Sequence, residues 1–151
     1  MQIFLLAGIL ELMDLIMDNV KKTKNIKTAL KAIACWSKAN QGVEICGFIG
    51  FDTNQQKYVC KLEKNCSSEP THFFAIDALN YLIFKNKYSM ISVFHSHVLG
   101  DENPSEFDIK MSENCCIPFL VYSLNTDKFK IYEPRSSECN SEQLQELIKK
   151  L

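Results

Sequence analysis

Apolar residues recur at intervals of three and four from residue 25 to residue 40, which is the spacing of one face of an α-helix. The residues on this face are Ile26, Ala29, Leu30, Ile33, Ala34 and Ser37. Asn25 or Thr28 is suited to cap the start of this helix, and Gly42 is placed to end it. The pattern therefore predicts a helix over residues 25–40.

Apolar and alternating runs along the rest of the chain predict strands separated by further helices. The predicted strands cover residues 43–52, 57–64, 89–95, 117–124 and 128–134. The short polar links DTNQQ and NTD join the first two and the last two of them, as in β-hairpins. The further helices cover residues 74–87, 104–114 and 140–151. In the last of these, Asn140 and Gln143 stand in the relation of a capping box.

The predicted order is helix, strand, strand, helix, strand, helix, strand, strand, helix. Interleaved helices and strands with hairpins indicate an α/β fold, in which helices pack against a mixed sheet. A length of 151 residues suits one domain, and a hydrophobic content of 46% can build its core. We expect residues 25–151 to form this domain and residues 1–24 to form a helical extension that packs on it or on a partner. Met13 and Met17 are alternative natural starts of the chain.

The apolar start of the chain does not predict a membrane protein. The run over residues 1–10 is too short to span a bilayer, and Glu11 and Asp14 interrupt the apolar pattern after it. A secretory signal has basic residues near its start, whereas none precedes Lys21 here. We therefore expect no membrane span.

Composition narrows the range of partners. The chain has 17 basic and 18 acidic residues, a net charge of −1, and so lacks the basic excess that nucleic-acid binding usually requires. Its seven cysteines are odd in number and form no Cys-x-x-Cys pair, which argues against a disulfide framework and against a separate thiolate zinc site. They are typical of small buried residues in a reducing cytosol. From the cysteines we therefore expect a cytoplasmic protein, and from the charge balance we expect no nucleic-acid partner.

The stretch VFHSHVLGDENPSEFD, residues 93–108, carries the candidate chemistry. His95 and His97 lie two residues apart at the end of a predicted strand, where alternate side chains share a face. Ser105 and Asp108 lie three residues apart on a predicted helix and also share a face. Two imidazoles and a carboxylate can hold zinc through three protein ligands, which leaves the fourth position for water, as in catalytic zinc sites.

Each half of this stretch also has an ordinary structural explanation. Paired histidines are often surface groups or hydrogen-bonded to each other, and Ser-x-x-Asp before an apolar residue is a helix N-cap motif. Ser105 can serve as a cap and as a site residue at once.

Glu44 stands among apolar neighbours near the start of the predicted strand 43–52, where burial would raise its pKa and suit it to be a general base. The alternative for Glu44 is a strand-edge carboxylate that faces water.

Together these residues resemble the catalytic JAMM form of the JAB/MPN family. The family motif is an early glutamate, then His-[Ser/Thr]-His, seven residues, and Ser-x-x-Asp. In this chain the motif reads Glu44, His95-Ser96-His97, residues 98–104, and Ser105-Glu106-Phe107-Asp108. The segments FAIDALNY and IPFLVYSL look like the prokaryotic and phage branch of the family. The resemblance covers roughly residues 27–135.

The resemblance implies a three-layer α/β/α fold of the cytidine-deaminase type and a zinc-dependent peptidase or isopeptidase. His95, His97 and Asp108 would hold Zn²⁺. Glu44 would act as the catalytic base, and Ser105 would hydrogen-bond the oxyanion or the ligand shell. Val98 stands where many family members have proline.

Asp101 and Glu102 add carboxylates to the loop of the motif, and we interpret them as solvated loop residues. The short run between Phe74 and His95 leaves little room for the insertion that linkage-specific deubiquitinases carry.

The family leaves the substrate and partner open. The expected substrate is the C-terminus of a ubiquitin-like or sulfur-carrier-type protein. The alternatives are a peptidase-like protein of phage tail-tip assembly and a non-catalytic MPN-type scaffold. A deaminase would need His-x-Glu with a downstream Pro-Cys-x-x-Cys, which the chain lacks.

Overall fold

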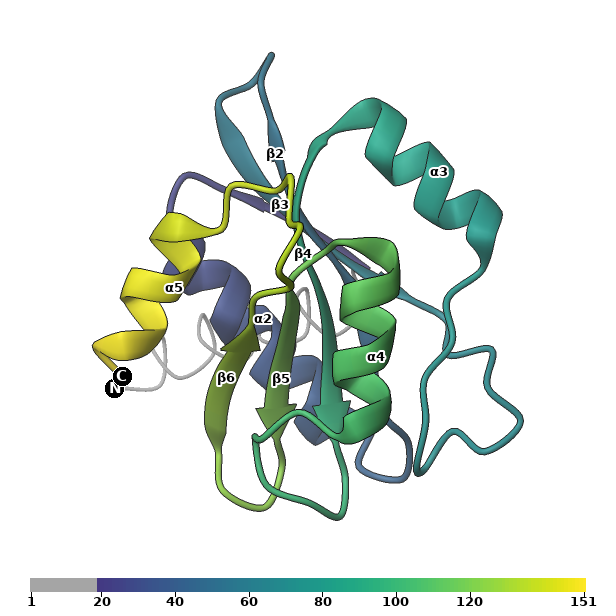
Figure 1. Ribbon diagram of the computed structural model, residues 1–151. Helices are drawn as coiled ribbons and strands as arrows, with labels where there is room; N and C mark the ends of the chain where they lie inside the picture. Colours follow the sequence, from purple (N-terminus) through teal and green to yellow (C-terminus); the bar gives the residue numbers. More distant parts are fainter. Residues whose placement is uncertain (1–18) are drawn as a thin grey trace, which may run out of the picture.

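The structure is a computed structural model, and it describes residues 19–151 (Figure 1). The elements, labelled as in Figure 1, are β1 (Val20–Thr23), α2 (Ile26–Ala39), β2 (Cys46–Asp52), β3 (Lys57–Glu63), α3 (Ala78–Lys87), β4 (Ser89–His97), α4 (Glu106–Cys115), β5 (Phe119–Ser123), β6 (Lys128–Tyr132) and α5 (Glu142–Lys149). No helix in this described part is long and apolar enough to cross a membrane.

The strands form one six-stranded sheet in the order β1-β3-β2-β4-β5-β6. All neighbouring strands are antiparallel except β4 and β5, which run parallel and are joined by the crossover helix α4. The predicted mixed sheet and both predicted hairpins, β2–β3 and β5–β6, are therefore confirmed. β4 lies between β2 and β5, near the middle of the sheet, so both of its backbone edges are paired.

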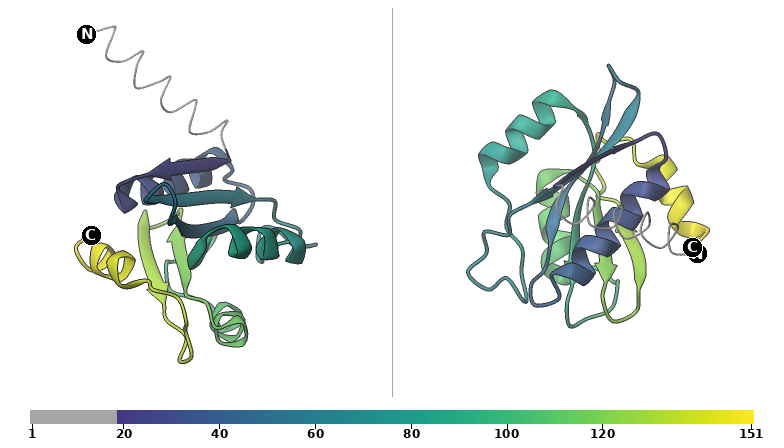
Figure 2. Two further views of the ribbon diagram at one scale, coloured as in Figure 1. Left: turned by 90° about the horizontal axis from the view of Figure 1, so that it is seen from above. Right: turned by 180° about the vertical axis from the view of Figure 1, so that it is seen from behind.

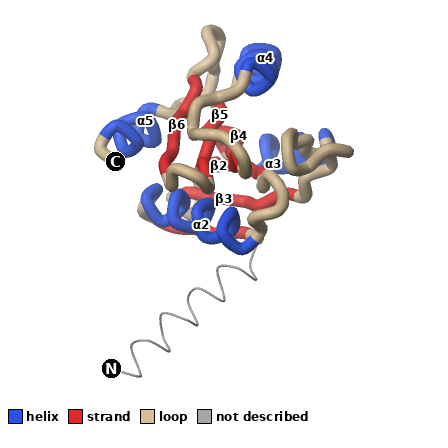
Figure 3. Tube along the Cα trace, turned by 90° about the horizontal axis from the view of Figure 1, so that it is seen from below, coloured by secondary structure: helices blue, strands red, loops and turns tan. Residues whose placement is uncertain are grey.

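Helices cover both faces of the sheet and make three layers, as Figures 2 and 3 show. On one face, the apolar sides of α2 and α5 pack on a cluster that includes Trp36, Phe94 and Leu144. On the other face, Phe84 of α3 packs with Phe48 and other residues of the sheet. The alternation of β2 side chains between these two clusters is the expected two-residue period of a strand. The α/β class with a three-layer arrangement is thus confirmed.

The N-terminal part of the sheet corrects one prediction. Val20–Thr23 lie in the segment 1–24 that we expected to be a helical extension, but they form β1, which is antiparallel to β3. β1 is an edge strand that backbone pairing with β3 holds in place. Its polar sequence VKKT therefore lacks the apolar pattern by which a buried strand is predicted. The expectation for residues 1–18 lies outside the described residues.

Several predicted boundaries also differ. α3 begins at Ala78 with the Asp77 carboxylate as its N-cap, so the apolar residues 74–76 do not belong to the helix. β4 runs on to His97, two residues beyond the predicted end. At α5 the predicted pair of Asn140 and Gln143 is wrong, since Ser141 is the N-cap and its side chain makes no capping hydrogen bond. The backbone of residue 142 instead donates to the Asn140 side chain, which makes a turn just before the helix.

Gly47 in β2 provides a test of the packing between β2, β3 and β4. A Cβ atom at this position would lie 2.0 Å from the backbone oxygen of Lys61 and 2.5 Å from the ring of Phe94. We expect Gly47→Ala to lower the free energy of unfolding by about 3 kcal/mol, because backbone and ring must both shift. Urea unfolding followed by Trp36 fluorescence measures this. The control is Gly42→Ala, where a Cβ atom meets nothing within 4 Å. Equal stability of the two variants would contradict this packing.

Candidate metal centre

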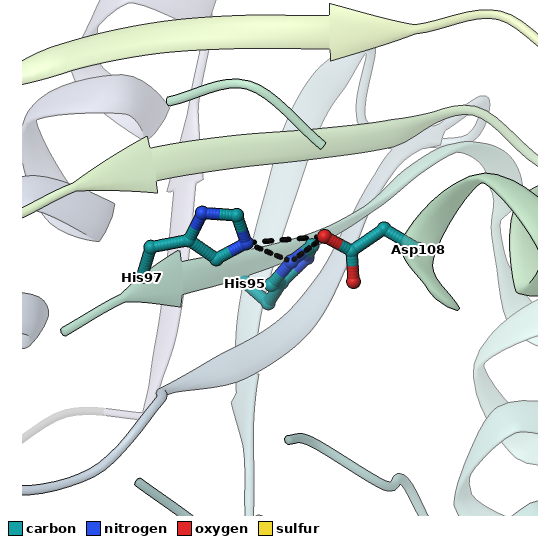
Figure 4. Close-up of side chains that lie close together, drawn as sticks. All are labelled: His95, His97 and Asp108. Atoms are coloured by element: carbon teal, nitrogen blue, oxygen red, sulfur yellow. Dashed lines mark hydrogen bonds and ion pairs between the residues drawn. The ribbon is translucent and has the colours of Figure 1, made fainter. Parts of the chain in front are cut away.

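β4 supplies two imidazoles to one side of the sheet. His95 and His97 are alternate residues near its C-terminal end, and their Nε2 atoms lie 3.2 Å apart (Figure 4). The intervening Ser96 points the other way, and its Oγ accepts a hydrogen bond from the backbone N–H of Ile45 at 2.9 Å. The period of the strand thus separates two functions: the histidines converge, while the serine holds the segment that leads into β2.

α4 supplies the carboxylate. Ser105 is its N-cap, and its Oγ accepts from the backbone N–H of Asp108 at 3.1 Å. In return, Oδ2 of Asp108 accepts from the backbone N–H of Ser105 at 2.8 Å, which completes a capping box. The same Oδ2 lies 3.1 Å from Nε2 of His95 and 3.0 Å from Nε2 of His97. The cap and the metal explanations therefore agree, because the cap aims the carboxylate at the histidines.

The three converging atoms suit a metal ion. They lie 3.0–3.2 Å from one another, whereas bonds of 2.0–2.2 Å in a tetrahedral zinc site put ligand atoms about 3.3 Å apart. Nδ1 of His97 lies 2.7 Å from the carbonyl oxygen of Asp101, a hydrogen bond that turns the lone pair of a neutral ring toward the cluster. Two nitrogen lone pairs and a carboxylate oxygen repel one another unless a cation or a proton lies among them. His95, His97 and Asp108 thus form a group able to hold a metal ion.

The electrostatics of the cluster follow from its burial. Burial lowers the pKa of His95, and the nearby Asp108 carboxylate offsets this only in part. Burial alone would raise the pKa of Asp108, but hydrogen bonds from both histidines outweigh it and hold that pKa far below its usual range. For His97, burial lowers the pKa, while Asp108 and the Asp101 carbonyl raise it by more. A metal ion at His97 therefore competes with protons for this nitrogen at a higher pH than at an ordinary imidazole.

The ring of His95 is held by packing. It is fully buried, and Phe74 stacks on it with ring centroids 4.4 Å apart and an interplanar angle of 22°. The Nδ1 atom of His95 has no hydrogen-bond partner among the described residues. The two histidines thus differ, since a hydrogen bond to a carbonyl orients His97 and an aromatic side chain orients His95. The position of Phe74 could not be predicted, because the sequence FAIDALNY has the pattern of a helix.

Glu44 lies two residues before β2 rather than on it, and only 6% of its surface is exposed. Of the two alternatives that the sequence left open for Glu44, the structure shows burial rather than a strand edge that faces water. Burial raises its pKa to about 7, while His97 lowers it and Asp108 raises it further. Glu44 is not part of the converging group that can hold a metal ion. Its carboxylate is therefore separate from the ligands, yet near enough to interact with their charges.

The loop before α4 uses its carboxylates locally. The Asp101 side chain accepts from the backbone and the side chain of Asn103, and the Glu102 carboxylate accepts from the Thr126 hydroxyl at 2.7 Å. Neither carboxylate belongs to the metal-binding group. Asp101 nevertheless matters through its backbone carbonyl, a contribution that side-chain motifs do not reveal.

Comparison with known proteins agrees with this arrangement. Residues 27–139 match the family described as prokaryotic homologs of the JAB domain. The chain therefore belongs to this family, and the predicted membership is confirmed.

Among curated proteins, the chain is similar to tail tip assembly protein K of Escherichia phage N15, with 24% identity over 107 residues. The match covers 70% of this chain and 43% of the phage protein, so the chain spans less than half the length of that relative.

Two solved structures are similar. A solution structure of a protein from Desulfitobacterium hafniense has a TM-score of 0.51 and 20% identity, and the match covers 77% of this chain and 94% of that chain. A solution structure from Salinibacter ruber has a TM-score of 0.45 and 18% identity, with 70% of this chain and 78% of that chain covered. The first likeness concerns the fold alone.

The raised pKa of Glu44 predicts a pH-dependent stability of the metal-free protein. The pKa rises from 4.5 to about 7 on folding, so the ionised carboxylate destabilises the folded state progressively between these values. We expect Glu44→Gln to gain on the order of 2 kcal/mol in unfolding free energy over the wild type between pH 5 and pH 8. Urea unfolding in the presence of a chelator measures this. The control Glu102→Gln alters a partly exposed carboxylate whose pKa is lowered rather than raised, so it should show no such gain. Parallel wild-type and Glu44→Gln profiles would contradict the burial.

Proposed function

We propose that the protein is a zinc-dependent JAMM metallopeptidase or isopeptidase, which hydrolyses a peptide or isopeptide bond. The observation that carries this proposal is the convergence of His95, His97 and Asp108 within 3.2 Å beside a buried Glu44. Three protein ligands leave one position open, which is the pattern of catalytic zinc rather than structural zinc. Thiolates, the usual ligands of structural zinc sites, do not take part in the group.

Two residues of the chain have separate roles in the proposed reaction: Glu44 transfers the proton, and Ser105 stabilises the oxyanion. The chemistry that a bound zinc ion supplies is polarisation of the scissile carbonyl and acidification of water. Glu44 is the general base: its carboxylate takes a proton from the attacking water and delivers it to the leaving amine. A pKa near neutrality suits both transfers. Ser105 accepts the Asp108 N–H through its oxygen and keeps its own O–H to donate to the developing oxyanion.

The substrate proposed for this site is the C-terminus of a ubiquitin-like or sulfur-carrier-type protein. The match to the JAB family favours this class of substrate, and the short α3–β4 connection leaves no room for the insertion of linkage-specific deubiquitinases. A second candidate is a role in phage tail-tip assembly, which the similarity to the phage N15 protein supports. The third possibility, a scaffold without catalysis, would leave the converging ligands and the buried base without a use.

The metal and the base can be tested separately. We expect purified wild-type protein to bind about one zinc ion per chain and His97→Ala to lose it, because two ligands hold zinc far more weakly than three. Glu44→Gln should keep the zinc and lose hydrolysis by about 10²- to 10⁴-fold, the usual contribution of a general base. Elemental analysis measures the zinc. Cleavage of a ubiquitin-like protein with a C-terminal extension measures hydrolysis.

Glu102→Gln is the matched control, since its carboxylate accepts from the Thr126 hydroxyl and lies outside the metal-binding group, so zinc and hydrolysis should be unchanged. Protein made with zinc present but found without metal would overturn the enzyme proposal. Activity that survives Glu44→Gln would remove only the general-base role. Zinc binding without cleavage, together with direct binding to a tail-tip protein, would favour the assembly role.

A further inference from the structure

Asn65 lies in the segment 64–77 that connects β3 to α3, and its side-chain amide makes hydrogen bonds with five backbone groups. Its Nδ2 donates to the carbonyl oxygens of Glu44, Phe73 and Pro70, at 2.8, 2.9 and 3.4 Å. Its Oδ1 accepts from the backbone N–H groups of Ser67 and Ala75, at 3.0 and 3.1 Å. One side chain thus connects both ends of this segment with the residue that we propose as the catalytic base.

The backbone of Glu44 depends on this segment because it lies outside the sheet. Its N–H donates to the carbonyl of Pro70 at 2.7 Å, and its carbonyl accepts from Asn65 at 2.8 Å. The next residue, Ile45, is held differently, since both of its backbone groups bond to Ser96 of β4. Glu44 is therefore held from one side by β4 through its neighbour and from the other side by the segment that Asn65 organises.

The same amide fixes the aromatic side chain behind His95. It accepts from the N–H of Ala75 and donates to the carbonyl of Phe73, so its two bonds bracket Phe74. The Phe74 ring stacks on His95 at 4.4 Å. Phe73, on the outer side, contacts Phe107, the residue before Asp108, with ring centroids 5.4 Å apart. The segment therefore touches the base, one imidazole and the helix that carries the carboxylate.

We infer that Asn65 is the positioning residue of the site, which sets the place of Glu44 relative to the metal ligands through one amide that also seats Phe74 on His95. Its consequence for hydrolysis rests on the proposed function above. An amide suits this place because it offers two N–H donors and an acceptor within one rigid plane. A base displaced by about 1 Å can cost about 10²-fold in rate, so a residue that touches no substrate can still control the rate.

The two halves of the amide can be separated by substitution. Asn65→Asp keeps the oxygen that accepts from Ser67 and Ala75, but places a second acceptor against the carbonyls of Glu44 and Phe73. Asn65→Ala removes both halves. Asn40→Ala is the matched control, since the Asn40 amide donates to the Trp36 carbonyl at the end of α2 and has no bond to the site.

We expect Asn65→Asp to keep one zinc ion per chain and to lower kcat for the extended ubiquitin-like protein by about 10- to 100-fold, with KM changed less than about threefold. The backbone amide of Glu44, measured by hydrogen exchange, should lose protection, while the amides of β5 keep theirs. Asn65→Ala should show the same pattern with lower stability. Asn40→Ala should leave kcat and the Glu44 amide unchanged.

Two outcomes overturn the inference. One is a backbone amide of Glu44 that exchanges as slowly in Asn65→Asp as in the wild type. This result would show that the hydrogen bond from Asn65 to Glu44 is dispensable, and it does not depend on whether the wild type cleaves the extended ubiquitin-like protein. The other is a kcat at the wild-type level despite a deprotected Glu44 amide. A wild type that cleaves nothing counts against the proposed function alone, and selective deprotection of Glu44 would still support Asn65 as the residue that positions it.

Discussion

The site rests on one electrostatic constraint: three atoms that each carry a lone pair meet within 3.0–3.2 Å in a buried place. Nε2 of His95, Nε2 of His97 and Oδ2 of Asp108 can stay there only with a positive species among them. The fold imposes this meeting through a central strand and through a helix cap that aims the carboxylate. In the metal-free protein, protons can supply this positive charge. A bound metal ion would supply it through bonds to all three atoms.

The surroundings of this cluster divide acid–base roles between two carboxylates. Asp108 is buried but accepts hydrogen bonds from both histidines and from the cap, which hold its pKa low. Glu44 is also buried, and burial raises its pKa to about 7. Two acidic residues of one site thus acquire opposite properties, as expected when burial dominates at one and is overcome by hydrogen bonds at the other. This difference underlies the proposed roles of ligand and base.

Local patterns predicted a large part of the structure, and non-local contacts account for the rest. The two-residue spacing of His95 and His97 and the three-residue spacing of the cap follow from strand and helix geometry, so sequence alone suggested their convergence. β1 was missed because VKKT has no hydrophobic pattern, and its partner strand lies far along the chain. Residues 74–76 were assigned to a helix because they are apolar, yet Phe74 and Ile76 are partly buried by packing against the site and the sheet, while Ala75 is exposed.

Asn65 is the clearest example of a contact that local sequence patterns do not predict, since it binds the backbone of a residue 21 positions away. Nothing in its neighbourhood in the sequence distinguishes it from an ordinary loop asparagine. Ser96 is similar, because the motif includes it, but its bond to Ile45 spans 51 positions. Sequence motifs identified the groups that carry charge or bind metal, whereas the structure was needed to find the uncharged side chains that hold them in place.

The most direct test of a metal site built by this convergence is X-ray absorption at the zinc edge of the zinc-loaded protein. Nitrogen and oxygen ligands at about 2.0–2.1 Å, with the multiple scattering of two imidazoles and no sulfur, are predicted. The result is decisive because the chain also has seven free cysteines, which are strong zinc ligands. A sulfur shell at about 2.3 Å would contradict the central claim and place the metal elsewhere.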